Sequence, residues 1–111
     1  MTWATARRFV LPALKEGSED DVVDDISRGL AMLWEGERSA MVTQFTHSPR
    51  TIHVWLGGGD LADLLRLMPG VEAYGRAMGC VWITGEGRKG WQRALKPFGY
   101  ARDGAELRKA L

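Results

Sequence analysis

Residues 51–68 have the sequence TIHVWLGGGDLADLLRLM, in which the spacing of the apolar residues changes from that of a strand to that of a helix. Up to Leu56 every second residue is aliphatic, which predicts a β-strand with two different faces. After Asp60, a preferred helix N-cap, the leucines recur at helical spacing. Residues 57–59 are glycines and predict a turn between the two patterns. The stretch therefore predicts a strand, a glycine turn and a helix in succession.

Two further β-rich segments precede this strand, at residues 30–35 and 39–46. Gly36 separates the first from the second, and Ser48-Pro49-Arg50 separates the second from residues 51–56. Short turns between consecutive strands predict an antiparallel meander of the three.

Two helices are predicted before the meander. Residues 2–15 place apolar side chains near helical spacing, and Pro12 limits the length of a continuous helix. A second helix begins at Ser18, which with Asp21 has the spacing of a capping box, with Asp in place of the usual Glu or Gln.

The C-terminal half alternates helices and strands. Pro69-Gly70 interrupts the helix after Asp60, so two short helices or one kinked helix are both compatible with the sequence. The apolar run at residues 80–84 predicts a central strand buried on both faces, and Cys80 in it predicts an inert, buried thiol. Residues 88–96 predict a short helix that buries Trp91 and Leu95.

The predicted order is ααβββαβαβ, with a possible further strand if residues 100–102 and 106–109 form a hairpin. Such an order gives an α+β fold with a mixed sheet. We expect one domain over residues 1–111, with a helical N-terminal segment at 1–17 and the core at 18–111.

Composition excludes several classes of function. Fifteen Lys and Arg residues against fourteen Asp and Glu give a net charge of +1, so a nucleic-acid partner is not expected. A single cysteine and two histidines, His47 and His53, have no metal-ligand spacing, so no metal is expected. No apolar run reaches the roughly 20 residues that a membrane span needs. We therefore expect a cytoplasmic protein with no membrane partner.

The predicted order and several local motifs resemble the GCN5-related N-acetyltransferase (GNAT) fold. That fold has one strand, two helices, three strands and then helix, strand, helix, strand; here the first strand is missing or replaced by the N-terminal helix. GRKGWQRAL at residues 87–95 and FGY at 98–100 resemble small GNAT-like proteins of tailed bacteriophages and prophages. The resemblance covers residues 18–110 and is most specific over the last thirty. It implies an active or degenerate acyl-CoA-dependent N-acetyltransferase, in the host cytoplasm or, if structural, in the virion.

In that family the pyrophosphate of acetyl-CoA is held by a loop of the form Gln/Arg-x-x-Gly-x-Gly/Ala, between the fourth strand and the third helix. The resemblance therefore implies cofactor contacts at Trp55, Leu56, Gly57, Gly58, Gly59 and Asp60. The Gln or Arg of the motif is absent, and Asp60 puts a carboxylate where the pyrophosphate is expected. Two unit charges 4 Å apart repel by about 4 kcal/mol at a surface-like dielectric. A plain glycine turn capped by Asp60 is the alternative interpretation.

Candidate acid–base residues are few. A transferase needs a base for the amine and an acid for the leaving thiolate. Glu35, Glu37 and Glu86 lie at predicted strand ends, and Tyr100 is a candidate acid. Exposed carboxylates and a core tyrosine are the alternative interpretation.

A protein partner is the competing functional hypothesis. If no helix covers the face of Trp55, then Trp34 and Trp55 form an apolar patch for a protein partner or a second copy. Arg88 and Lys89 oppose the dipole at the start of their helix, which favours an acidic partner or simple solvation. The same fold would then serve as a non-catalytic interaction module or a virion component.

Overall fold

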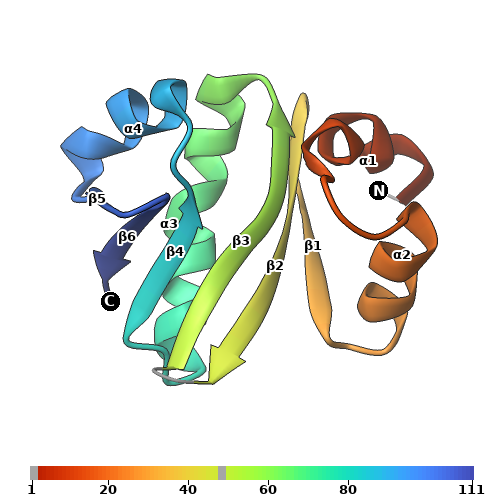
Figure 1. The fold of residues 1–111 in the computed structure, drawn as a ribbon, viewed down its shortest axis with the longest axis horizontal. Helices are drawn as coiled ribbons and strands as arrows, with labels where there is room; N and C mark the ends of the chain where they lie inside the picture. The colour runs from red at the N-terminus through yellow and green to blue at the C-terminus, as the bar shows by residue number, and fades with distance from the viewer. Residues whose placement is uncertain (1–2, 48–49) are drawn as a thin grey trace.

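The strands form one mixed sheet with the order β1-β2-β3-β4-β6-β5 in the computed structural model, which describes residues 3–47 and 50–111 (Figure 1). The strands are β1 (Ala31–Glu35), β2 (Ser39–His47), β3 (Arg50–Gly59), β4 (Trp82–Glu86), β5 (Ala101–Asp103) and β6 (Glu106–Ala110). The helices are α1 (Trp3–Val10), α2 (Glu19–Ser27), α3 (Leu61–Ala77) and α4 (Lys89–Leu95), with single 3-10 turns η1 (Leu11–Ala13) and η2 (Lys96–Phe98). The predicted α+β class with a mixed sheet is confirmed, and the further C-terminal strand is present.

The predicted antiparallel meander is confirmed for β1, β2 and β3. β4 then joins β3 as a parallel neighbour, and β6 and β5 add the C-terminal hairpin in antiparallel pairing. Of the turn predicted at residues 48–50, positions 48 and 49 lie outside the described residues.

Local sequence signals explain where α2 begins and where α1 ends. The Ser18 hydroxyl accepts from the amide of Asp21 at 3.3 Å, and the amide of Ser18 donates to the Asp21 carboxylate at 2.8 Å. The predicted capping box is therefore confirmed at the start of α2. α1 ends at Val10 and gives way to a 3-10 turn that contains Pro12.

The sheet separates two apolar cores. α1 and α2 pack on one face, over a core that includes the fully buried Ala6, Val10 and Val22. α3 and α4 pack on the other face, over a core that includes Ile52 and Ile83. Ala6 and Val10 have no exposed surface, so α1 is part of this core.

α3 is one helix that runs through Pro69, so the two-helix alternative is wrong. Asp60 caps it as predicted, because its carboxylate accepts from the amide of Asp63 at 2.9 Å. In Figure 1, α3 runs behind the sheet and crosses β3 and β4, while α1 and α2 lie to the side of β1 and β2.

The sequence predicted that β4 is buried on both faces, and this prediction is wrong. It begins at Trp82, after the buried Cys80 and the half-exposed Val81. Ile83 is buried against α3, whereas Thr84 on the opposite face is half-buried. The reason is that α1 and α2 pack on β1, β2 and β3, so this face of β4 has no helix of that pair over it. The inert Cys80 thiol is consistent with its burial, which raises its pKa.

Candidate functional site

β3 and β4 are neighbours in the middle of the sheet, and they diverge part of the way along their length. Their parallel pairing covers three positions and ends at His53 and Thr84. Just beyond this point β3 has an extra residue relative to β2, since Val42 faces Leu56 and Thr43 faces Val54. Trp55 is that extra residue, and a bulge of this kind bends a strand and increases its twist. We call the divergence of β3 and β4 beyond His53 and Thr84 the split.

A small apolar cavity lies behind the split, between the sheet, α3 and α4. Val54, Gly85 and Trp91 are among its lining residues. Its volume of about 20 Å³ is enough for one water-sized group. Val54 and Glu86 also line an open hollow on the other face, so the cavity and this hollow lie on either side of the split.

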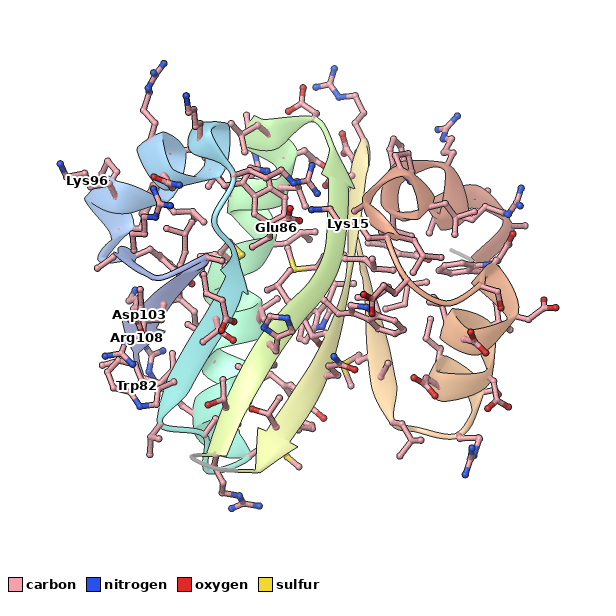
Figure 2. The ribbon with its side chains drawn as sticks, in the orientation of Figure 1. Lys15, Trp82, Glu86, Lys96, Asp103 and Arg108 are labelled. Carbon is pink, nitrogen blue, oxygen red and sulfur yellow. The ribbon has the colours of Figure 1, made fainter. Side chains whose placement is uncertain are left out.

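In front of the split, two adjoining hollows share His53 and Glu106. We call them together the front groove. It lies on the face of β3, β4 and β6 that carries His53, Thr84 and Glu106, and the segment after η1 borders it through Lys15 and Glu16. Figure 2 shows Trp82, Asp103 and Arg108 gathered at one end of this face, and Glu86 and Lys15 facing one another at the other.

His53 is the best-placed proton acceptor in the front groove. Its Nδ1 lies 2.7 Å from Thr84 Oγ1 and 3.5 Å from Glu106 Oε2. Burial lowers the pKa of His53, and the nearby Glu106 carboxylate raises it by less. The lowered pKa favours the neutral imidazole, in which one ring nitrogen has a lone pair that can accept a proton.

Glu86, a candidate base from the sequence, lies at the edge of the same groove but is a weak base. Its carboxylate is 2.9 Å from Lys15 Nζ and 3.3 Å from Arg88 Nε. The hydrogen bond from Lys15 is the main reason that the pKa of Glu86 is lowered. A carboxylate held ionised by two cations binds a further proton poorly.

The other three acid–base candidates lie away from the front groove, and Glu37 is exposed in the turn between β1 and β2. Glu35 ends β1, two strands from β4. Tyr100 is buried in the core, and its hydroxyl donates to the buried Glu72 at 2.5 Å. Burial raises the pKa of Tyr100. The core interpretation of Tyr100 is therefore confirmed, and no contact of its hydroxyl reaches the groove among the residues described.

The glycines at 57–59 are strand residues rather than a turn, which corrects the predicted end of the strand at Leu56. They end β3 and pair with residues 39–41 of β2. A side chain on Gly58 would overlap the carbonyl oxygen of Phe9 in α1, and a Cβ on Gly57 would lie 2.6 Å from the Trp91 ring. The glycines thus allow α1 and α4 to approach the end of the strand closely.

The expected cofactor residues are placed as follows. Trp55 is at the bulge, Leu56 is buried against α1, and Asp60 caps α3. The carboxylate of Asp60 already accepts from an amide at the α3 N-terminus, where a phosphate would otherwise bind.

The predicted apolar patch of Trp34 and Trp55 is wrong, because the two rings lie on opposite faces of the sheet. Trp34 packs on the α3 side, where it contacts Tyr74 edge-on at 5.7 Å between ring centroids and donates from Nε1 to Thr43 at 2.9 Å. Trp55 packs on the α1 and α2 side. Trp55 lies on the face opposite Ile52 and Val54, as strand alternation requires, and the bulge places Leu56 on the same face as Trp55.

Arg88 has partners within the chain. It binds Glu86 and lies 5.1 Å from the centroid of the Trp91 ring, so neither a solvated side chain nor an acidic partner is needed to explain it. Lys89, in the first turn of α4, is exposed.

Sequence reasoning missed His53, Thr84 and Glu106 as a group. The available signal was the polar His53 in an aliphatic alternation, which marks a side chain on the outer face of a strand. The parallel pairing that brings Thr84 beside it joins residues 31 positions apart, and no local pattern predicts such a register.

Over residues 3–47 and 50–111, no group of three or more metal-ligating side chains converges. No helix in those ranges is long and apolar enough to cross a membrane. Comparisons of the chain with protein-family models, with curated proteins and with solved structures found no match.

Proposed function

We propose that the chain is an acyl-CoA-dependent N-acyltransferase of the GNAT type, with acetyl-CoA bound in the split. The observation that carries the proposal is the divergence of the parallel strands at a bulge, with a cavity behind it. Beyond His53 and Thr84 the facing edges of β3 and β4 have no ladder partners in each other. Backbone amide and carbonyl groups on such edges can bind the amides of an extended ligand such as the pantetheine arm of CoA.

The order of elements supports the same proposal. Two helices, a three-strand meander, a helix, a strand parallel to the last strand of the meander, and a short helix follow the GNAT order without its first strand. The volume of about 20 Å³ behind the split favours a small acyl group such as acetyl over a long acyl chain.

The residues fit the acyl and pantetheine part of the ligand better than its pyrophosphate. Gly57 and Gly58 have Trp91 and Phe9 against them, and Asp60 occupies the N-terminus of α3. The chain therefore lacks the family's usual phosphate loop, and we expect its affinity for acetyl-CoA to be modest. When bound, acetyl-CoA supplies an acyl group activated as a thioester.

A second candidate is a non-catalytic interaction module of the same fold. It is favoured by the same contacts of Phe9, Trp91 and Asp60, which leave no phosphate cradle at residues 57–60. Under this alternative the split is only a packing feature, and acetyl-CoA does not bind.

The experiment is calorimetric titration of the full chain with acetyl-CoA, with thermal unfolding measured in parallel. Gly85→Ala is the informative variant, because its Cβ points into the split and meets Val54 at an ordinary 3.6 Å, so the fold should tolerate it. Gly90→Ala is the matched control, since a Cβ there has no atom within 4 Å.

Binding by the wild type and Gly90→Ala, weakened at least tenfold in Gly85→Ala, supports the transferase. Ligand at 100 times its Kd should then stabilise the fold by about 2.7 kcal/mol. No heat and no shift in melting temperature at millimolar acetyl-CoA would support the interaction module instead. Equal binding by all three proteins would place the ligand outside the split.

A further inference from the structure

We propose that the front groove binds the acyl acceptor as a protonated alkyl amine without a neighbouring carboxylate, and that His53 takes a proton from it through Nε2. This inference rests on the proposed transferase function, whose acyl donor would reach the groove through the split. His53 lies where the split begins, because it belongs to the last paired position of β3 and β4 before they separate. It is therefore close to the proposed site of the acyl donor.

The contacts of His53 assign its ring nitrogens. Nδ1 faces both Thr84 Oγ1 and the carboxylate of Glu106. A carboxylate only accepts hydrogen bonds, so the neutral ring is satisfied when Nδ1 carries the proton. Nε2 then holds the free lone pair. Because Thr84 and Glu106 lie at the same nitrogen, this is not a relay that activates the Thr84 hydroxyl; both residues orient the ring.

The charges around the groove select a cation. Lys15 is paired with Glu86 at 2.9 Å and Arg108 with Asp103 at 3.1 Å. Glu106 is in contact with His53 and, among the residues described, has no ion pair with Lys or Arg. When His53 is neutral, the negative charge of the Glu106 carboxylate has no positive side chain beside it among the residues described. This carboxylate is half-exposed at the edge of the groove.

A second carboxylate strengthens this selection. Glu16 lines the same groove beside Lys15. A ligand that brings its own carboxylate would meet the carboxylates of Glu16 and Glu106 in the groove, and like charges a few ångströms apart repel. A lysine-like side chain or a polyamine is therefore preferred to a free amino acid.

The groups that face His53 decide whether it can accept the proton. Glu106 of β6 raises its pKa, and burial among β3, β4 and β6 lowers it by more. Glu86 on β4 and Lys15 on the segment after η1 neutralise each other, as do Asp103 on β5 and Arg108 on β6. The amine binds as alkylammonium beside a ring whose lowered pKa favours the neutral form. Only in the transfer step does the proton pass to Nε2, which converts the alkylammonium to the free amine and the imidazole to imidazolium. The new positive charge lies beside Glu106, which stabilises it.

The test is the pH titration of the His53 ring by NMR, with and without n-butylamine, in the full chain. His53→Gln assigns the signal, because His47 is the one other histidine in the sequence. A bound ammonium near the ring should lower the His53 midpoint by about one pH unit, as expected for a unit charge several ångströms away. 4-Aminobutyrate has the same four-carbon chain and amine with a carboxylate in place of the terminal methyl, and should produce at least a fivefold weaker response.

Variants separate the roles of the two residues. Glu106→Gln should weaken butylamine binding about tenfold, whereas Glu37→Gln, an exposed carboxylate in the β1–β2 turn, should leave it unchanged. With acetyl-CoA present, kcat of the wild type should increase with pH as the His53 ring loses its proton. His53→Gln should still bind the amine, but its kcat should not show this increase.

The outcomes also separate this inference from the proposed function. If acetyl-CoA binds but saturating butylamine leaves the His53 midpoint unmoved, the inference is wrong and the transferase stands. Equal responses to butylamine and 4-aminobutyrate would likewise overturn the choice of a carboxylate-free amine. If the amine moves the midpoint but acetyl-CoA does not bind, the amine-binding groove is supported and the transferase is refuted.

Discussion

Replacing Gly58 with alanine tests how α1 is held against the end of β3. The Cβ of an alanine would overlap the backbone carbonyl oxygen of Phe9, next to the fully buried Val10. Backbone cannot move aside as a flexible side chain can, so α1 has to shift as a unit. Overpacking of this kind costs about 1–3 kcal/mol. With an unfolding entropy of about 2.1 cal/mol/K per residue over 111 residues, the melting temperature should fall by about 4–13 °C.

The assay is thermal unfolding by circular dichroism, with Gly90→Ala as the matched control. Gly90 lies in the first turn of α4 with open space around it, so alanine there should raise stability by up to about 1 kcal/mol. Hydrogen exchange should increase in residues 3–14 of Gly58→Ala before it does in α3. A melting temperature within about 2 °C of the wild type would refute the close packing of α1 on β3.

Three further predictions concern the polar contacts of the fold. Tyr100→Phe should lower the unfolding free energy by about 1–3 kcal/mol in urea titrations, because the buried Glu72 loses its tyrosine donor; Tyr74→Phe is the control, and an equal loss there would contradict the assignment. Ser18→Ala should cost about 1 kcal/mol through the lost cap of α2, and an unchanged melting temperature would refute it. The pKa of Glu19 is lowered to about 2 by its hydrogen bonds from Arg7 and Trp3. A depressed carboxyl pKa gives stability that is present above the normal pKa and lost as pH falls towards 2, so melting temperature should fall less steeply from pH 5 to pH 2 in Glu19→Gln than in the wild type.

The elements themselves follow from local signals in the sequence. The capping box at Ser18, the N-cap at Asp60 and the C-terminal hairpin depend on neighbours within a few positions, and the structure has each of them, the hairpin turning at residues 104–105. A strand whose outer face is polar and a helix with an apolar stripe are also local patterns. These signals were sufficient for the order of elements and the α+β class.

The errors concern contacts between distant residues. The glycines at 57–59 have the composition of a turn, but pairing with β2 keeps them in the strand. The burial of β4 depends on how far α1 and α2 reach across the sheet, and residues 80–84 contain no information about that. Trp34 and Trp55 lie on opposite faces because of the strand registers: Trp34 pairs with Met41 on the α3 side, whereas Trp55 lies on the α1 and α2 side with Leu56.

The bulge therefore has more influence on function than the glycines that follow it. Without the extra residue at Trp55, β3 would continue straight beside β4, and Val54 and Gly85 would be a normal ladder position with no split between them. The close approach of Phe9 and Trp91 to the glycines then holds the end of β3 in its bent course, away from β4. The glycines matter because they let helices pack against a diverted strand, which is a structural use that does not require a phosphate. It follows that the lack of a phosphate cradle at residues 57–60 and the presence of the split are independent features, and the proposed binding of acetyl-CoA has to be judged at Gly85, within the split, rather than at Gly58.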